Sequence, residues 1–375
     1  MSIRIGIVGA GVMARFHAQG FRQAGAEVVA LADPGRERAL ASAAELAIPA
    51  VHPDLAAMIA AERLDAVSLA IPNHLHAPLA IQALAAGLHV FCEKPPARNA
   101  AEAQSMRRAA LDSGRVLRFN LNNRCRPESL ALRTAVRAGG IGRLNGIQAV
   151  WVRRSGIPGF GGWFTTRACS GGGPLIDLVH MLDLGLWLAG YPAAEHVLAR
   201  SWDDFSDDRS RKGPWGIGDG TAPVDVEMAC HGSVALAGGT LLSFRTSWAE
   251  MVEREHIQVA LQGVRGGAVL ERSFARGPAE ADAADRCVLL AQAGGKAADT
   301  VIPCAADPAM GRIASAAAFV AACQGAETPL GTPDEAVALM RIIDAIYASA
   351  AQGVPISLPA ARRRAPRLQA AAAGA

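Results

Sequence analysis

The chain has 375 residues, a length that suggests two domains, each able to bury a core of its own. Hydrophobic residues make up 51% and charged residues 19%, and a net charge of +3 excludes a strongly basic nucleic-acid-binding surface. No apolar run reaches the ~20 residues that a membrane helix needs, and no secretory leader precedes the first strand. Seven scattered cysteines without a C-x-x-C pair are typical of a reducing compartment and predict no metal site. We therefore expect a cytoplasmic protein with neither nucleic-acid nor membrane partners.

Short apolar runs alternate with helix-like segments through the first third of the chain. The strands are predicted at 3–9, 27–33, 65–72, 89–95 and 116–120. Amphipathic segments, such as 76–87 and 100–114, separate them. Continuous apolar strands with helices between them indicate a parallel sheet that is covered on both faces. The pattern predicts an α/β Rossmann domain, a doubly wound parallel sheet, over residues 1–122.

The first strand runs into a G-x-G-x-x-A pattern, residues 9–14, which opens a helix. Its glycines permit a tight turn and let a pyrophosphate approach the backbone amides at the helix N-terminus. Asp33 ends the second strand about 20 residues on, where an acidic side chain accepts ribose hydroxyls. Asp33 would repel a 2′-phosphate, so NAD is predicted over NADP, although Arg36 and Arg38 lie close enough to pair with a phosphate. The predicted cofactor contacts here are Gly9, Gly11, Val12, Met13 and Asp33.

Two polar segments, AIPNHLH (70–76) and FCEKPP (91–96), end neighbouring strands of this predicted sheet. Ligands bind beyond the carboxyl ends of parallel strands, so both segments should face the nicotinamide end of the cofactor cleft. An arbitrary Glu-Lys pair at a strand end is usually a surface ion pair, but this position favours a functional role. The predicted cofactor contacts from these segments are Pro72, Asn73, His76, Glu93 and Lys94.

The pattern changes after about residue 122, where a second domain is predicted. The predicted strands are 145–154, 226–236, 239–249, 256–263 and 266–271. They follow one another closely, which favours a large open, mostly antiparallel sheet. The predicted helices are 127–140, 311–325 and 332–353, the last with Thr332 as N-cap and Pro333 at its first position. We expect an α+β domain over 123–360 for substrate binding and oligomerisation, and a disordered tail over 361–375.

Glycines 171–173 precede a predicted helix that carries Asp177, His180 and Asp183. A spacing of three projects these side chains towards one side of a helix. Taken alone, a helix histidine is more often packed or solvated than catalytic.

Three segments together resemble the glucose-fructose oxidoreductase, inositol dehydrogenase and rhizopine catabolism family (Gfo/Idh/MocA). They are GAGVMARFH, AIPNHLHAPLAIQALAAGLHVFCEKPPA and SGGGPLIDLVHMLDLGLWLAG. The resemblance implies a Rossmann domain followed by an α/β domain whose open sheet mediates oligomerisation, here as a homodimer or homotetramer. It makes Lys94 the E-K-P lysine that hydrogen-bonds the reacting hydroxyl and the cofactor, before a peptide bond to Pro95 that can be cis.

The same resemblance makes His180 the general acid/base and Asp177 a catalytic partner that contacts substrate or orients the imidazole. Family members space this pair as D-x-x-x-H, whereas Asp177 precedes His180 by one residue fewer in this chain. The shorter spacing leaves open where the Asp177 side chain lies.

Further substrate contacts are predicted from two loops. The segment 151–167 sets Arg153, Arg154 and Trp163 among glycines, as a flap over a polyol or acidic sugar, or as a plain surface turn. Asn122 and Arg124 follow the fifth strand, where they would bind hydroxyls or serve as turn and cap residues. With Asp177 and His180, these residues form the predicted substrate site.

Together with these patterns, the resemblance implies an NAD-dependent oxidoreductase that transfers a hydride between nicotinamide and a hydroxyl carbon of a cyclic polyol, sugar or sugar derivative. His180 would accept the hydroxyl proton while Lys94 polarises the oxygen. The alternative is a glycoside hydrolase of the same family that oxidises the sugar transiently, eliminates the aglycone and re-reduces the product. A nonenzymatic NAD sensor is disfavoured because both Lys94 and His180 are present. A short-chain dehydrogenase is disfavoured because neither Tyr191 nor Tyr347 is followed four residues on by lysine.

Overall fold

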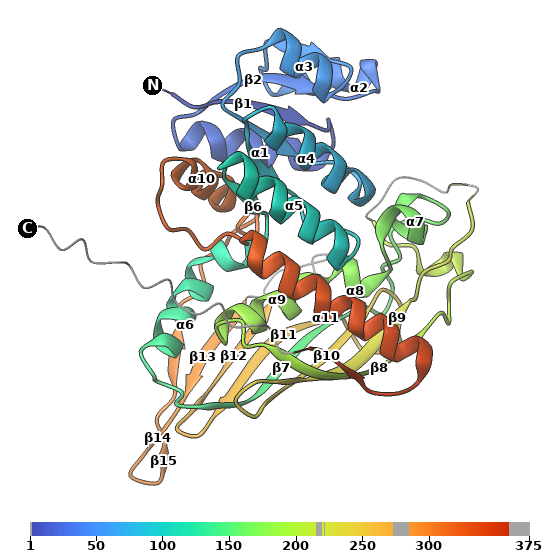
Figure 1. Ribbon diagram of the computed structural model, residues 1–375. Helices are drawn as coiled ribbons and strands as arrows, with labels where there is room; N and C mark the ends of the chain where they lie inside the picture. Colours follow the sequence, from blue (N-terminus) through green and yellow to red (C-terminus); the bar gives the residue numbers. More distant parts are fainter. Residues whose placement is uncertain (1, 215–219, 221, 273–284, 360–375) are drawn as a thin grey trace, which may run out of the picture.

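The computed structural model describes residues 2–214, 220, 222–272 and 285–359. The tail predicted over 361–375 lies outside these residues. Figure 1 shows two parts, a parallel sheet wrapped by helices and a broad sheet below it, with helix α11 (Pro333–Gln352) between them. Among the described residues, no helix is both long enough and apolar enough to cross a bilayer.

The N-terminal part is a six-stranded sheet with the order β3-β2-β1-β4-β5-β6, and every pair is parallel. Its strands are β1 (Arg4–Val8), β2 (Glu27–Ala32), β3 (Ala50–His52), β4 (Ala66–Leu69), β5 (His89–Cys92) and β6 (Leu117–Phe119). Its helices are α1 (Val12–Gln23), α2 (Arg36–Glu45), α3 (Leu55–Ala61), α4 (His76–Ala85) and α5 (Ala100–Ser113), with a 3₁₀ turn η1 (Asn73–Leu75). The strands are nearly all buried, as sheets covered on both faces require. The predicted doubly wound fold is confirmed.

The C-terminal part is built on a nine-stranded sheet with the order β16-β13-β12-β11-β7-β10-β9-β8-β17. Its strands are β7 (Leu144–Val152), β8 (Ala194–Trp202), β9 (Ala229–Leu236), β10 (Thr240–Ser247), β11 (His256–Gly263), β12 (Gly267–Arg272), β13 (Arg286–Leu290), β16 (Thr300–Ile302) and β17 (Ile356–Ser357), and β14 (Gln292–Ala293) pairs with β15 (Lys296–Ala297) separately. Among the described strand pairs of this sheet, only β7 and β10 run parallel, so the mostly antiparallel sheet is confirmed. The strand predicted first in this part, at 145–154, is β7. It lies inside the sheet between β10 and β11, so neighbours along the chain are not always neighbours in the sheet.

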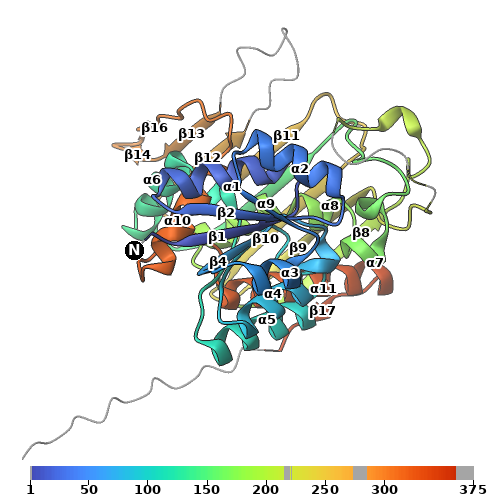
Figure 2. The same cartoon turned by 90° about the horizontal axis from the view of Figure 1, so that it is seen from above.

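Helices of the C-terminal part cover one face of this sheet and also reach back to the N-terminal part. They are η2 (Asn122–Cys125), α6 (Pro127–Arg137), η3 (Trp163–Thr165), α7 (Arg167–Ser170), α8 (Pro174–Asp177), α9 (Val179–Leu188), η4 (Arg209–Arg211), α10 (Arg312–Cys323) and α11. Thr332 caps α11 in a capping box with Glu335, as predicted for that N-cap. Helix α11 lies between α5 and β8, whereas α10 packs on α1, so each part covers surface of the other (Figures 1 and 2).

Candidate active site

Lys94, directly after β5, forms an ion pair with Asp177 from the C-terminal part. The Lys94 Nζ donates to Asp177 Oδ1 and to the Asp177 carbonyl oxygen, each at 2.9 Å. Burial would raise the pKa of Asp177, but the charges of Lys94 and Arg153 and a hydrogen bond from Trp248 hold it at about 2. Asp177 is therefore a carboxylate at neutral pH. The Lys94–Pro95 peptide bond is cis, as the resemblance implied.

The shortened spacing between Asp177 and His180 is accommodated by a break in the predicted helix. Helix α8 ends at Asp177 and α9 begins at Val179, with Leu178 between them at φ −92° and ψ 24°. The break lets the Asp177 carboxylate reach Lys94 although His180 follows after only three positions. Asp183, predicted on the same side, instead binds Arg124 in the interior.

The glycine segment 171–173 sets the position of α8 through very close contacts. A Cβ on Gly171 would lie 2.9 Å from Arg98 Cα. A Cβ on Gly172 would lie 1.8 Å from the Tyr347 hydroxyl oxygen, and one on Gly173 would lie 2.1 Å from the Glu227 carbonyl oxygen. The buried Glu227 carboxylate accepts hydrogen bonds from the amides of Gly173 and Leu175 and from the Tyr347 hydroxyl. Glu227 and Tyr347, which sequence reasoning missed, thus anchor the turn that carries Asp177.

His180 is 7% exposed, and its Nδ1 is buried without a hydrogen-bond partner among the described residues. Buried polar atoms are nearly always paired, so this nitrogen marks a place for a ligand group. Burial, followed by the charges of Lys94 and Arg312, lowers the pKa of His180 to about 3. The imidazole is therefore neutral at neutral pH and able to accept a proton.

A second layer of side chains supports Asp177 from behind. Trp248, fully buried after β10, donates from Nε1 to Asp177 Oδ2 at 2.9 Å. Arg153 lies with Nη1 3.9 Å from the same oxygen, and its Nε donates to Glu255 Oε1 at 2.9 Å. Arg153 therefore lies beside Asp177, where its side chain contacts carboxylates of the protein and the Trp151 ring. Its contact with substrate stays a prediction. Trp248 and Glu255 belong to no recognised motif, and sequence reasoning assigned neither of them a role.

The G-x-G-x-x-A turn fits a dinucleotide. Gly9 has φ +102°, and a Cβ there would lie 2.1 Å from the Ala70 carbonyl oxygen, so only glycine permits this turn. A Cβ on Gly11 would meet no atom within 4 Å, so space is open above the start of α1. No side chain caps α1, and Val12 is 65% exposed at its first position. Free amides and open space at a helix N-terminus suit a pyrophosphate.

Asp33 is placed where the ribose-binding carboxylate was predicted. It is 6% exposed, and its carboxylate accepts from the Ala10 amide at 2.9 Å and the Gly35 amide at 2.8 Å. Burial acts to raise its pKa, but these amides and Arg38 outweigh that effect, and the pKa is lowered. Arg38 already pairs with Asp33, which weakens its case as a partner for a 2′-phosphate.

Glu93 holds the E-K-P loop together rather than standing free. Its Oε1 lies 2.9 Å from His17 Nε2 and accepts from Asn120 Nδ2 at 2.7 Å, while Oε2 accepts from the Lys94 amide at 3.1 Å. Burial acts to raise the pKa of Glu93, but His17 and Asn120 hold it at about 2. His17 is a further residue whose role sequence reasoning missed.

Segment 70–76 holds two predicted cofactor residues with polar side chains, Asn73 and His76. Both side chains contact the protein itself. Asn73 is buried and donates to the Ser170 carbonyl oxygen at 2.8 Å, which ties the cofactor loop to α7. The ring nitrogens of fully buried His76 lie 2.8 Å from the Pro95 carbonyl oxygen and 3.0 Å from the Ile71 carbonyl oxygen. His76 thus braces the two loops between which it lies, and its contact with the cofactor stays a prediction.

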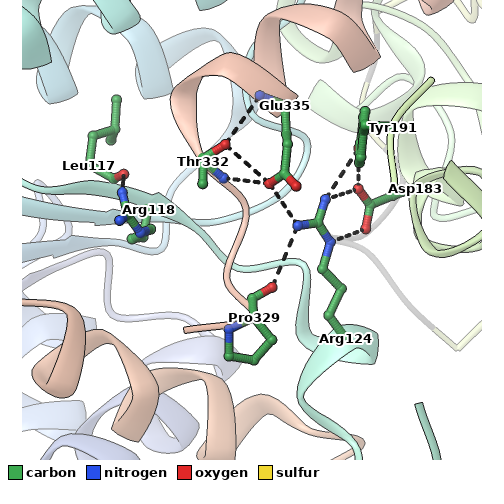
Figure 3. Close-up of polar contacts among 8 residues, drawn as sticks. All are labelled: Leu117, Arg118, Arg124, Asp183, Tyr191, Pro329, Thr332 and Glu335. Carbon is green, nitrogen blue, oxygen red and sulfur yellow. Dashed lines mark hydrogen bonds and ion pairs between the residues drawn. The ribbon is translucent and has the colours of Figure 1, made fainter. Parts of the chain in front are cut away.

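Arg124, which was predicted to bind substrate, is paired with side chains of the protein in this structure. Figure 3 shows its guanidinium enclosed by the side chains of Asp183, Glu335 and Tyr191. Its side chain has no exposed surface, so a substrate cannot reach it. Neighbouring Asn122 is likewise buried and donates to the Met310 carbonyl oxygen. Both residues hold the C-terminal part together.

The loop predicted as a flap is fastened to a second loop. The Gly156 amide donates to the Arg211 carbonyl at 3.0 Å, and the Asp225 amide to the Thr165 carbonyl at 3.1 Å. Trp163 stacks on Phe164 with ring centroids 3.8 Å apart. Arg154 is exposed and donates to the Val252 carbonyl oxygen at 3.4 Å, outside the Lys94–Asp177 contact.

Comparison with known proteins gives matches along most of the chain. The D-glucoside 3-dehydrogenase of Escherichia coli K12 is 35% identical over 272 residues, which cover 72% of this chain and 77% of the relative. The levoglucosan dehydrogenase of Pseudarthrobacter phenanthrenivorans is 27% identical, with 72% and 73% covered. A solved levoglucosan dehydrogenase in complex with NADH and levoglucosan has a TM-score of 0.80 at 22% identity, and the match covers 96% of this chain and 100% of that one.

Two family models match in succession. Residues 3–121 match the oxidoreductase family with an NAD-binding Rossmann fold, and residues 129–269 match the GFO/IDH/MocA C-terminal domain. The glycine turn, Asp33 and the Lys94–Asp177 contact lie in the corresponding parts of the chain. The chain thus belongs to the Gfo/Idh/MocA family of NAD-binding oxidoreductases.

Proposed function

We propose that the protein oxidises a secondary ring hydroxyl of a glucoside or a related cyclic sugar, with NAD as the hydride acceptor. The observation that carries this proposal is the ion pair of Lys94 with Asp177 beside a neutral His180 whose Nδ1 lacks a partner among the described residues. This set provides a hydrogen-bond donor and a proton acceptor for one hydroxyl group. The glucoside, levoglucosan and inositol dehydrogenases among the relatives support a cyclic substrate with several hydroxyls.

In this mechanism, bound NAD supplies the nicotinamide that takes up the hydride. Lys94 donates a hydrogen bond to the reacting oxygen, and its hydrogen bond to Asp177 Oδ1 holds Nζ in position for this role. His180 accepts the hydroxyl proton on a ring that burial and the nearby charges of Lys94 and Arg312 keep neutral beforehand. The buried second layer of Trp248 and Arg153 keeps the Asp177 carboxylate in place and away from water.

The flap supports a sugar ring as the substrate. Trp163 and Phe164 stack half-buried in a loop that leads directly into α7 and the glycine segment 171–173. Aromatic faces pack on the C–H faces of pyranose rings. Arg153, at the start of the same loop, already contacts Asp177 and so connects the flap to the reacting group.

The proposal is tested by following NADH formation with purified protein on glucosides, free aldoses, inositols, sugar acids and a chromogenic glycoside. Lys94→Ala and His180→Ala should each lower kcat by roughly 10²- to 10⁴-fold while NADH affinity stays near the wild-type value. Exposed Lys296 and His256 provide matched controls, as Lys296→Ala and His256→Ala. Release of the chromogenic aglycone without net NADH formation would instead support the hydrolase alternative, and near-normal turnover of both site variants would refute the assigned roles.

We also propose that copies of the chain associate through the open face of the large sheet. On β8, Val197 and Ala199 are buried on the side of α11, whereas Leu198 is 47% exposed on the opposite side. Leu241 on β10 is 52% exposed and Trp202 on β8 is 43% exposed. Exposed apolar side chains on an uncovered sheet face support a second copy as the partner.

A further inference from the structure

Two arginines from distant parts of the chain lie on one aromatic ring beside the glycine turn. Phe16 belongs to α1, and the Arg15 Cζ lies 4.7 Å from its ring centroid. The Arg312 Cζ, from the first residue of α10, lies 5.3 Å from the same centroid. The packing of α10 on α1 creates this pair, which no sequence motif indicates.

Neither guanidinium has a carboxylate partner among the described residues. The acidic groups whose fields reach Arg312 are Glu93 and Asp307. Glu93 is engaged by His17 and Asn120, and Asp307 accepts hydrogen bonds from the backbone amides of Ala309 and Gly311. The Arg312 side chain itself donates a long hydrogen bond, 3.4 Å from Nη1 to the Ala309 carbonyl oxygen.

Two like charges that converge on one ring repel each other, and part-burial of Arg312 makes the repulsion costlier. Stacking on Phe16 offsets only part of this cost. An anion that pairs with both guanidinium groups would offset this repulsion, and arginine forks match phosphate oxygens well.

We propose that Arg15 and Arg312 form a clamp on the diphosphate of the dinucleotide, so that the C-terminal part takes direct part in cofactor binding. Arg15 follows Val12 by three positions in the uncapped first turns of α1, where the free amides already favour a diphosphate. Arg312 approaches the same place from α10. Cofactor binding then fastens α10 to α1 across the two parts of the chain.

The test measures dissociation constants by NADH fluorescence and by calorimetry with ADP-ribose, which carries the diphosphate without the nicotinamide. Arg312→Gln and Arg15→Gln should each weaken both ligands by roughly ten- to a hundredfold, the loss expected for one charge-assisted hydrogen bond. Arg312→Lys should retain part of the affinity because it keeps the charge. Arg22→Gln, at the far end of α1, is the matched control and should change neither constant.

Unchanged affinity for both ligands in the Arg312→Gln and Arg15→Gln variants would overturn the proposal. Weaker NADH but unchanged ADP-ribose binding would also overturn it, because Arg312 would then act on the nicotinamide half. Unchanged NADH binding with a raised KM only for sugar acids would assign Arg312 to an anionic substrate instead. Circular dichroism confirms folding, and exposed Arg15 gives a variant whose substitution removes no buried contact. The dissociation constants for NADH and ADP-ribose do not depend on the identity of the sugar.

Discussion

Lys94 and Asp177 lie 83 positions apart and meet with 2.9 Å between Nζ and Oδ1. One side chain follows a strand of the dinucleotide-binding sheet, and the other ends a helix of one turn in the C-terminal part. The ion pair therefore exists only when both parts are folded and in contact. Changes that move Asp177 should therefore act on catalysis through the position of the Lys94 side chain.

Trp248 offers a sharp test of this point. Trp248→Phe keeps a large buried ring but removes the donor to Asp177 Oδ2, so kcat should fall by about tenfold or more. Because that hydrogen bond lowers the pKa of Asp177, its removal should also move the acidic limb of the kcat profile to higher pH. Trp202→Phe on the exposed sheet face is the control. A Trp248→Phe enzyme with an unshifted pH profile would show that Trp248 is only a packing residue.

His180 should make folding stability depend on pH. Its pKa is about 3 in the folded protein against an ordinary value of 6.5, so the unfolded chain binds more protons between these values. Stability is then fully present above about pH 6.5 and falls as the pH drops, by about 2 kcal/mol between pH 7 and pH 5. In urea unfolding, His180→Gln should flatten the pH dependence by that amount, whereas His256→Gln should not. Parallel curves for wild type and His180→Gln would contradict the buried neutral imidazole.

Arg124 should matter for stability rather than for substrate affinity. Arg124→Met leaves the Asp183 and Glu335 carboxylates without their cation, which typically costs about 3–5 kcal/mol for a buried pair. Adding Asp183→Leu should restore part of that loss because the unpaired carboxylate is then gone. Urea unfolding measures both effects. A normal unfolding free energy together with a raised KM would return Arg124 to the substrate site.

Asp33 should control the choice of nucleotide. Asp33→Asn keeps the size of the side chain but removes its negative charge, so NADH should bind roughly tenfold more weakly and discrimination against NADPH should shrink. Fluorescence titration with both nucleotides gives the ratio. Exposed Asp203→Asn serves as the control. An unaltered ratio of the NADH and NADPH dissociation constants would mean that another group binds the ribose hydroxyls.

Leu241 tests the association face. Leu241→Glu places a charge in the middle of the exposed sheet, which should lower the mass in light scattering towards that of one 38.8 kDa chain. Leu111→Glu, at an exposed apolar position of α5, should leave the mass unchanged. A wild-type protein that is already monomeric at micromolar concentration would exclude association through this face.

Local signals in the sequence predicted much of the scaffold. The glycine turn, Asp33 and the Thr332 cap each depend on residues within a few positions of one another, and all three have the expected geometry. Strand β3 was missed because its three residues are only half-buried and too few to show a period. The break after Asp177 was also missed, because apolar residues continue through it.

Directions of side chains and contacts across the fold were harder to predict. Arg124 and His76 follow strand ends, as site residues do, but their position along the chain does not reveal that both point into the interior. Trp248 and Glu227 reach Asp177 and its turn from 71 and 54 positions away, through the order of strands in the large sheet. A pattern of alternating residues identifies such strands without telling which neighbours they meet.

The glycine segment 171–173 leaves no room for a side chain between the two halves of the reaction centre. Its first member lies against the Arg98 backbone and its third against the Glu227 backbone. The distance between the lysine loop and the aspartate turn is thus set by main-chain contact, which does not adjust when neighbouring side chains change. Because we propose that the flap binds the sugar, attempts to redirect this enzyme should begin around Trp163 and leave these three glycines intact.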